Sequence, residues 1–143
     1  MAKDSSARDI HDRTFKFALR IVNLCQHLDA RPGVARLLGR QLLRSGTSIG
    51  ANVEESVAGQ SRADFVSKMM ISLKESRETL YWLRLVAAAR IVEPALLGDI
   101  QKEGEEISRV LGSIVVSTKR RSSLLTGGIL LAVLLVVSAV FNF

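Results

Sequence analysis

Apolar positions recur every three or four residues along most of the chain, which is the spacing of one face of an α-helix. They predict four amphipathic helices, over residues 9–29, 34–57, 62–89 and 94–122. Both prolines of the chain fall where this period breaks, and Ser61 followed by Asp64 is close to a helix-capping box. Four helices of similar length joined by short links predict an all-α fold, an antiparallel four-helix bundle.

The apolar stripes also predict which side chains form the core. On the first helix, Phe15, Ile21 and Cys25 fall on one face. The third helix carries apolar residues on two sides, because Ile71 and Trp82 lie away from its main stripe. We expect that this helix is central or that its second apolar side meets another subunit.

The last twenty residues, Leu124 to Phe143, contain only three polar side chains. A helix of that length spans about 30 Å, the thickness of the hydrocarbon core of a bilayer. The basic residues that precede it, Lys119, Arg120 and Arg121, are typical of the cytoplasmic flank of a membrane span. We therefore predict a bundle domain over residues 1–123 and an additional C-terminal apolar helix that crosses the inner membrane, with the bundle facing the cytoplasm.

Two other arrangements of this tail stay open. The tails of several subunits can cluster as the hydrophobic centre of an oligomer outside any membrane. Alternatively, the tail can fold back across its own bundle, because the Thr126–Gly128 segment permits a break in the helix.

Charge and cysteine content bear on the partners and the compartment of the protein. The 143 residues suit one domain with a full core, and their net charge of +6 favours polyanions such as nucleic acid or anionic lipid headgroups. The single cysteine, Cys25, excludes an intramolecular disulfide and fits a reducing compartment. The polar N-terminus has no apolar signal-peptide core.

Basic side chains on the second and third predicted helices form a candidate nucleic-acid surface. On the second helix they follow one another at intervals of one turn, so that repetition in an oligomer would produce a wide positive surface for phosphate backbones. A solvated helix face is the alternative. Tyr81 and Trp82 are expected to pack rather than to stack on bases. The predicted nucleic-acid-binding residues are Arg36, Arg40, Arg44, Arg62, Lys68 and Lys74.

Other polar residues on the same helices are interpreted as a structural network. Asn52 lies on an otherwise apolar stripe, where an unpaired amide would cost roughly 1–3 kcal/mol. Neighbouring charged side chains can pair with it and fix the register of the helices. The residues assigned to this network are Asn52, Glu55, Glu75, Arg77 and Glu78.

No pattern of residues indicates catalysis or metal binding. The chain lacks a Glu-x-x-His pair, and its two histidines, His11 and His27, lie more than four helical turns apart. There is no phosphate-binding glycine loop, and no nucleophile lies at motif spacing from a base. We predict a protein that is not an enzyme and that uses no metal or cofactor.

One long segment, Gln41 to Leu85, resembles the four-helix-bundle family that includes the intervening-sequence proteins of bacterial large-subunit ribosomal RNA genes. The shared pattern is QLLR, then a small-residue SI-x-x-N-x-x-E run, then a helix with LKE-x-x-E-T-x-YWL. The matching positions are Gln41 to Arg44, Ser48, Ile49, Asn52, Glu55, Leu73 to Glu75, Glu78, Thr79 and Tyr81 to Leu83. The apolar tail departs from the family pattern.

The resemblance implies a left-handed, up-down-up-down bundle that assembles as a ring, commonly a pentamer. It extends to the accessory variability determinant proteins of diversity-generating retroelements, which are similar bundles that bind a reverse transcriptase and nucleic acid.

Together these features predict a non-enzymatic, homo-oligomeric scaffold or adaptor. It would bind nucleic acid or a nucleoprotein partner through its basic face and would be anchored to the membrane by its C-terminal helix. The alternative is a membrane effector, in which ring assembly gathers the C-terminal spans and perturbs the bilayer.

Overall fold

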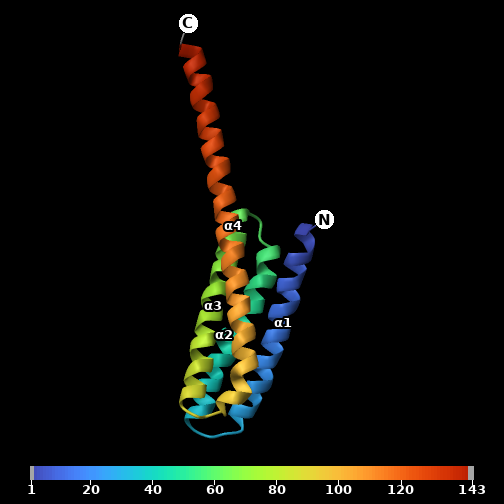
Figure 1. Cartoon of the computed structure of the whole chain (residues 1–143). Helices are drawn as coiled ribbons and strands as arrows, with labels where there is room; N and C mark the ends of the chain where they lie inside the picture. Colours follow the sequence, from blue (N-terminus) through green and yellow to red (C-terminus); the bar gives the residue numbers. More distant parts are fainter. Residues whose placement is uncertain (1, 142–143) are drawn as a thin grey trace.

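Four helices make up the computed structural model, which describes the backbone of residues 2–141 and the side chains of residues 9–121. They are α1 (Ala2–Asp29), α2 (Val34–Val57), α3 (Arg62–Ala88) and α4 (Pro94–Phe141). Consecutive helices run in opposite directions, and the part of the chain that the structure describes contains no strand (Figure 1). The predicted all-α, antiparallel, up-down-up-down bundle is confirmed.

Short turns separate the helices, and two of them end in a residue that favours the start of the next helix. The turn into α2 ends at Gly33, whose φ of 84° lies in the left-handed region that glycine adopts without strain. At the start of α3, the Ser61 hydroxyl accepts a hydrogen bond from the Asp64 backbone N–H at 3.1 Å, so the predicted cap is present. The apolar period therefore placed α2 and α3 to within one residue, whereas α1 begins earlier than predicted and α4 ends later.

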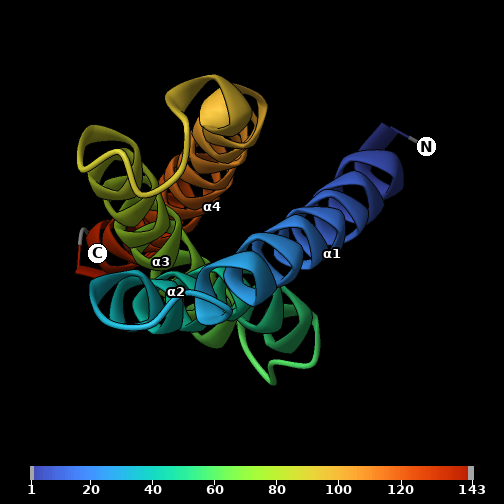
Figure 2. The same cartoon turned by 90° about the horizontal axis from the view of Figure 1, so that it is seen from below.

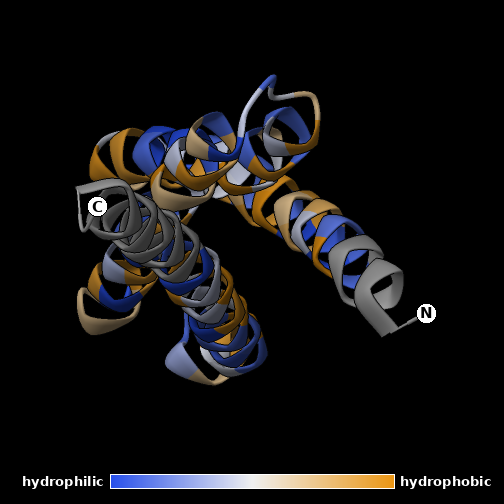
Figure 3. Ribbon diagram, turned by 90° about the horizontal axis from the view of Figure 1, so that it is seen from above, coloured by the Kyte–Doolittle hydropathy of each residue, from blue (hydrophilic) through white to orange (hydrophobic). Residues whose placement is uncertain are grey.

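The core is a column of aliphatic side chains with one aromatic ring. Phe17, Ile21, Leu42, Leu83 and Ile107 are fully buried. Viewed from above, the described helices carry both apolar and polar positions along their length (Figure 3).

One core prediction on α1 is wrong. Phe15, which the periodicity assigned to the core, has 72% of its surface exposed, and Phe17 is buried instead. The buried stripe runs through Thr14, Phe17 and Ile21, and Phe15 lies beside it on the outer face. Two phenylalanines two residues apart point to different sides of a helix, so only one of them can enter the core.

Packing is uneven around the bundle. Each helix packs along the next one in sequence, whereas α1 and α4 make fewer contacts and diverge toward the N-terminus of α1 (Figure 2). Where α1 and α4 meet, the Arg13 guanidinium donates to the carboxylates of Glu103 at 3.0 Å and Glu106 at 2.9 Å. The lack of a side chain at Gly104 leaves room for the Phe17 ring. The ion pairs of Arg13 and the contact of Phe17 with Gly104 therefore hold α1 against α4, the pair of helices with fewer contacts.

The additional C-terminal helix and its membrane span are not supported. α4 is one continuous helix from Pro94 to Phe141, without a break near residue 123. Within the residues that were described, no helix is long and apolar enough to cross a membrane. The described side chains of α4 include charged residues from Asp99 to Arg121.

Several predictions are corrected by this finding. They are the transmembrane anchor, the inner-membrane location, the membrane-anchored adaptor and the membrane effector. The side chains of residues 124–143 themselves lie outside the described part, and Lys119, Arg120 and Arg121 are exposed residues of α4.

The approach of α1 to α2 depends on glycine at one position. A Cβ atom at Gly46 would lie 2.7 Å from Ile21 Cγ2 and 2.9 Å from Ile21 Cγ1, both in a fully buried side chain. By contrast, Gly112 of α4 has nothing within 4 Å of the place a Cβ would occupy. The two glycines therefore form a matched pair for testing packing against helix propensity.

We expect Gly46→Ala to destabilise the protein by about 1–3 kcal/mol, because the added methyl group overpacks the α1–α2 contact. Gly112→Ala should stabilise it by up to about 1 kcal/mol, because alanine is the better helix former. Urea unfolding followed by circular dichroism measures both changes. Equal effects of the two substitutions would contradict the close approach at Gly46.

Candidate nucleic-acid interface

Small polar side chains hold α2 against α3. Ser45, Ser72 and Thr79 are fully buried. The Ser72 hydroxyl donates to the Ile49 carbonyl of α2 at 2.9 Å, and the hydroxyls of Thr79 and Ser45 are hydrogen-bonded across the interface at 3.0 Å. These bonds satisfy buried groups and set the register of the two helices. The register decides which charged side chains face each other at the surface.

One cluster of charged residues closes this interface on the outside. The Arg44 guanidinium of α2 forms an ion pair with Glu78 and lies 3.8 Å from the Glu75 carboxylate. Glu78 also accepts a hydrogen bond from the Trp82 indole N–H at 3.1 Å. That bond and the Arg44 contacts lower the pKa of Glu78. The folded-state pKa is depressed, so the stabilisation is present at neutral pH and is lost as the pH falls through that pKa.

The residues assigned to the structural polar network are only partly brought together. Glu75 and Glu78 share Arg44, as described. Asn52 donates to the Ser48 carbonyl of its own helix at 2.8 Å, and Glu55 forms an ion pair with Lys68. Arg77 is exposed and has no ion-pair partner in the described part of the chain.

The six residues predicted to bind nucleic acid divide into two groups. Arg36 lies 3.2 Å from the Asp29 carboxylate, and Arg44 and Lys68 have the partners given above. Arg40, Arg62 and Lys74 are exposed and unpaired among the described residues. Arg40 lines a hollow between α1 and α2, whereas Arg62 and Lys74 lie on α3. The predicted set is therefore not one continuous surface.

The outer face of α3 carries a row of three basic residues and one tyrosine. Of these four, only Lys74 was among the six residues predicted to bind nucleic acid. We define the α3 stripe as Lys74, Arg77, Tyr81 and Arg84, which follow at intervals of three, four and three residues and share one side of the helix. All four are exposed, and none of the three basic side chains has an acidic partner in the described structure. The stripe is about 15 Å long, given the helical rise of about 1.5 Å per residue.

An aromatic ring stands within this stripe. Tyr81 has 49% of its surface exposed, and its ring meets the edge of Trp82 at a centroid distance of 5.0 Å. The sequence-based interpretation assigned both rings to packing. The signal that could have placed Tyr81 outside was its spacing from Arg77 and Arg84, which puts it among the charged residues.

Basic residues continue at the start of α3. Arg62, Val66 and Met70 of α3 line a shallow hollow together with Lys119 of α4. Arg62 and Lys119 therefore add two exposed cations beyond the N-terminal end of the α3 stripe.

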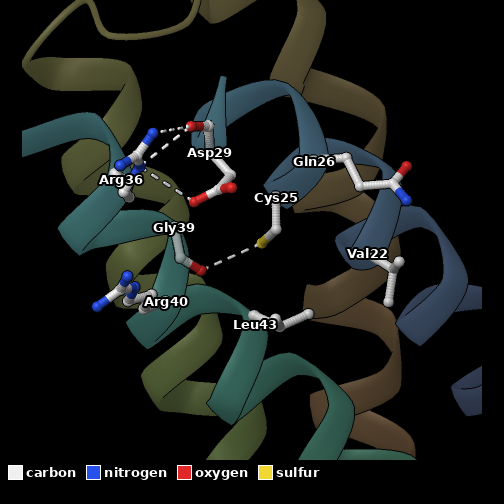
Figure 4. A pocket seen from close by; sticks show the side chains of 8 residues that line it. All are labelled: Val22, Cys25, Gln26, Asp29, Arg36, Gly39, Arg40 and Leu43. Atoms are coloured by element: carbon white, nitrogen blue, oxygen red, sulfur yellow. Dashed lines mark hydrogen bonds and ion pairs between the residues drawn. The ribbon is translucent and has the colours of Figure 1, made fainter. Parts of the chain in front are cut away.

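A second hollow lies between α1 and α2 (Figure 4). It encloses about 320 Å³, and its wall includes Val22, Cys25, Gly39, Arg40 and Leu43. The Cys25 thiol donates to the Gly39 carbonyl at 3.2 Å and is 5% exposed. Burial raises the pKa of this thiol to about 11. A neutral, buried thiol is a packing group rather than a nucleophile.

The histidines also have local partners. His11 lies 2.7 Å from the Glu54 carboxylate, and His27 lies 3.2 Å from the Arg31 guanidinium. Among the residues described, no group of three His, Cys, Asp or Glu side chains could hold a metal ion.

Comparison with known proteins gives the family. The model of the 23S rRNA-intervening sequence protein family matches residues 7–113, which include all of α2 and α3. The chain belongs to this family. The resemblance inferred from Gln41 to Leu85 is thereby confirmed.

A solved structure has the same fold as this intervening-sequence family member. It is a protein of unknown function from the S23 ribosomal protein family of Bacteroides thetaiotaomicron, with 40% sequence identity and a TM-score of 0.72. The similarity covers 77% of this chain and 97% of that one. A search of curated proteins gave no match. Neither the family nor the solved structure indicates a catalytic activity.

We predict that Cys25 of the folded protein resists maleimide at neutral pH, because the thiol is buried and protonated. The raised pKa favours the folded state below the ordinary thiol pKa, and this contribution is lost as the pH rises toward 11. Mass spectrometry of the modified protein measures the reaction, and a sample in denaturant is the positive control. Rapid labelling of the native protein at pH 7 would show that the thiol is accessible.

Proposed function

We propose that this intervening-sequence family protein binds nucleic acid through the α3 stripe. The observation that supports the proposal is the set of three exposed basic side chains, Lys74, Arg77 and Arg84, that no carboxylate neutralises in the described structure. Arg36, Arg44 and Lys68 have carboxylate partners, so binding a phosphate through them would require breaking an existing ion pair.

The chemistry of the stripe suits a phosphate backbone. Lysine and arginine that replace condensed counterions provide a binding free energy that depends steeply on salt concentration. Tyr81 adds a surface on which an unpaired base can stack. Because the family is described by its relation to 23S rRNA, RNA is the first ligand to test. A nucleoprotein partner would present the same phosphates.

We also propose that the protein acts by binding rather than by catalysis, as a homo-oligomeric scaffold. The family resemblance implies a ring, commonly a pentamer. An oligomer would repeat the α3 stripe in every subunit, and several weak contacts on one RNA would raise the overall affinity through effective concentration.

The test of the RNA site is the triple variant Lys74→Gln, Arg77→Gln and Arg84→Gln. We expect its affinity for a fluorescently labelled RNA hairpin to fall about tenfold or more at low salt. The slope of log K against log salt should become shallower by about 0.9 for each phosphate that the variant no longer neutralises. Fluorescence anisotropy across a salt series measures both quantities.

A matched control removes the same number of positive charges elsewhere. Lys16, Arg20 and Arg109 are exposed residues of α1 and α4 without ion-pair partners in the described structure. The corresponding glutamine variant should keep nearly all of its affinity and its salt dependence. If the two triple variants lose affinity equally, binding depends on overall charge and the α3 stripe is not the site.

Tyr81 gives a second, independent prediction. Tyr81→Ala should weaken binding to a single-stranded RNA by about 1–3 kcal/mol, because it removes one stacking surface. Tyr81→Phe should retain that binding, and neither variant should change the affinity for a fully paired duplex, whose bases are already stacked. Equal losses for single-stranded and duplex RNA would argue against stacking on Tyr81.

A further inference from the structure

The start of α3 continues the α3 stripe, with apolar residues between the charged ones. Arg62, Val66 and Met70 precede Lys74 at intervals of four residues, so they lie on the side of the helix that carries the stripe. Met70 is 39% exposed, and Val66 is partly buried. The order along this side of α3 is therefore a cation, two apolar side chains and a second cation.

These side chains line the hollow at the start of α3, which lies between α3 and its neighbour α4 (Figure 1). The hollow encloses about 460 Å³ and is open to solvent. We call it the α3–α4 hollow and define it by its described lining residues, Arg62, Ala63, Val66, Ser67, Met70 and Lys119.

Lys119 brings a cation to the hollow from α4. A Cβ atom at Gly104 would lie 3.1 Å from Leu80 Cδ2, so these two positions share one height on the antiparallel helices. Lys119 lies fifteen residues after Gly104, and Phe65 lies fifteen residues before Leu80. Lys119 is therefore level with Phe65, within the length of the hollow.

The charge of the hollow is not neutralised by the described part of the chain. None of its described lining residues is acidic, and neither Arg62 nor Lys119 has a hydrogen-bond or ion-pair partner among the residues described. The nearest acid in sequence, Asp64, lies against Gly59 in the turn before α3. Two like charges from different helices thus border one apolar hollow, which favours a ligand that carries negative charge.

We propose that the α3–α4 hollow holds one unpaired base of a single-stranded RNA whose phosphates bind the α3 stripe. This inference rests on the proposed function, and it assigns a place for a base in addition to the phosphates. A nucleotide within a strand has a flat base and a backbone phosphate on each side of it. Val66 and Met70 match the base, and the cations Arg62, Lys119 and Lys74 match the flanking phosphates.

The side chains of the hollow suit a base of any identity. The thioether of Met70 is polarisable and makes favourable contacts with aromatic rings, and its unbranched chain adapts to their shape. The aliphatic stems of Arg62 and Lys119 can cover apolar surface while their charged ends stay in water. Contacts of this kind do not read the hydrogen-bonding edge of a base, so binding tolerates any sequence.

The hollow and Tyr81 provide two separate places for bases. Tyr81 lies eleven residues after Met70, which is roughly 16 Å along α3. Lys74 and Arg77 lie between the two places. A strand that occupies both runs along the whole side of the helix, with its phosphates on the intervening cations.

Protection of a thiol in the full chain tests the hollow. Met70→Cys places one accessible thiol there, because the native Cys25 is buried. Saturating oligouridylate should slow the reaction of this thiol with maleimide about fivefold or more, since a bound base covers it. An abasic oligonucleotide of the same length carries the same phosphates without bases, and at saturation it should slow the reaction less than about twofold.

Leu37→Cys is the matched control for this experiment. Leu37 is 60% exposed on α2 and belongs neither to the α3–α4 hollow nor to the α3 stripe. Oligouridylate should leave the rate of its reaction with maleimide nearly unchanged.

An affinity measurement gives independent evidence on the same side chain. Met70→Ala should lower the affinity for oligouridylate about fivefold or more, and should lower the affinity for the abasic strand much less. Met70→Leu should recover most of the loss, because it supplies an apolar surface of similar size. Fluorescence anisotropy measures the affinities, and circular dichroism confirms that each variant is folded.

The proposal is overturned if oligouridylate and the abasic strand protect Met70→Cys equally, or if neither protects it. It is also overturned if the thiol of Met70→Cys reacts as slowly as Cys25 without RNA, since protein would then already cover the hollow. The triple variant at Lys74, Arg77 and Arg84 is measured with the same RNAs. If it binds like the wild type, the proposed function fails. If its affinity falls while Met70→Cys stays unprotected, only the base site fails.

Discussion

α2 packs closely against both α1 and α3, and these two contacts set the arrangement of the bundle. Gly46 leaves room for Ile21 of α1, and Ser45 and Ile49 meet Thr79 and Ser72 of α3 through hydrogen bonds. Small side chains permit these approaches, and the buried hydroxyls require a defined register because an unpaired one costs free energy. The positions of α1 and α3 are therefore both set by their contacts with α2.

The surface follows from that register. With α2 and α3 held at one height, Arg44 reaches Glu75 and Glu78, and Lys68 reaches Glu55. These pairs use the acidic side chains at the α2–α3 boundary, and they leave the basic residues of the α3 stripe without counter-charges. Ion pairs at one helix boundary thus decide where positive charge remains available. A shift by one helical turn would pair different residues and move the basic surface.

The corrections to the sequence-based predictions have a common physical cause. The period of 3.6 residues allows more than one apolar stripe on a helix, and α1 contains two, through Phe17 and through Phe15. Only the neighbouring helices decide which stripe is covered. Similarly, a regular row of arginines on α2 predicts a positive face, but the carboxylates that neutralise Arg36 and Arg44 come from α1 and α3. The length of an apolar run likewise suggested an anchor that no described helix supports.

Patterns in the sequence were enough to predict the class of the fold, the bounds of α2 and α3, the Ser61 cap and the family. Each of these is encoded locally, in the period of apolar residues, in a capping pair and in a contiguous motif. The packed bundle was needed to show which phenylalanine is buried, which described basic residues have no carboxylate partner and on which face Tyr81 lies. Those outcomes depend on side chains far apart in the chain, whose meeting is set by the packing of α2 between its neighbours.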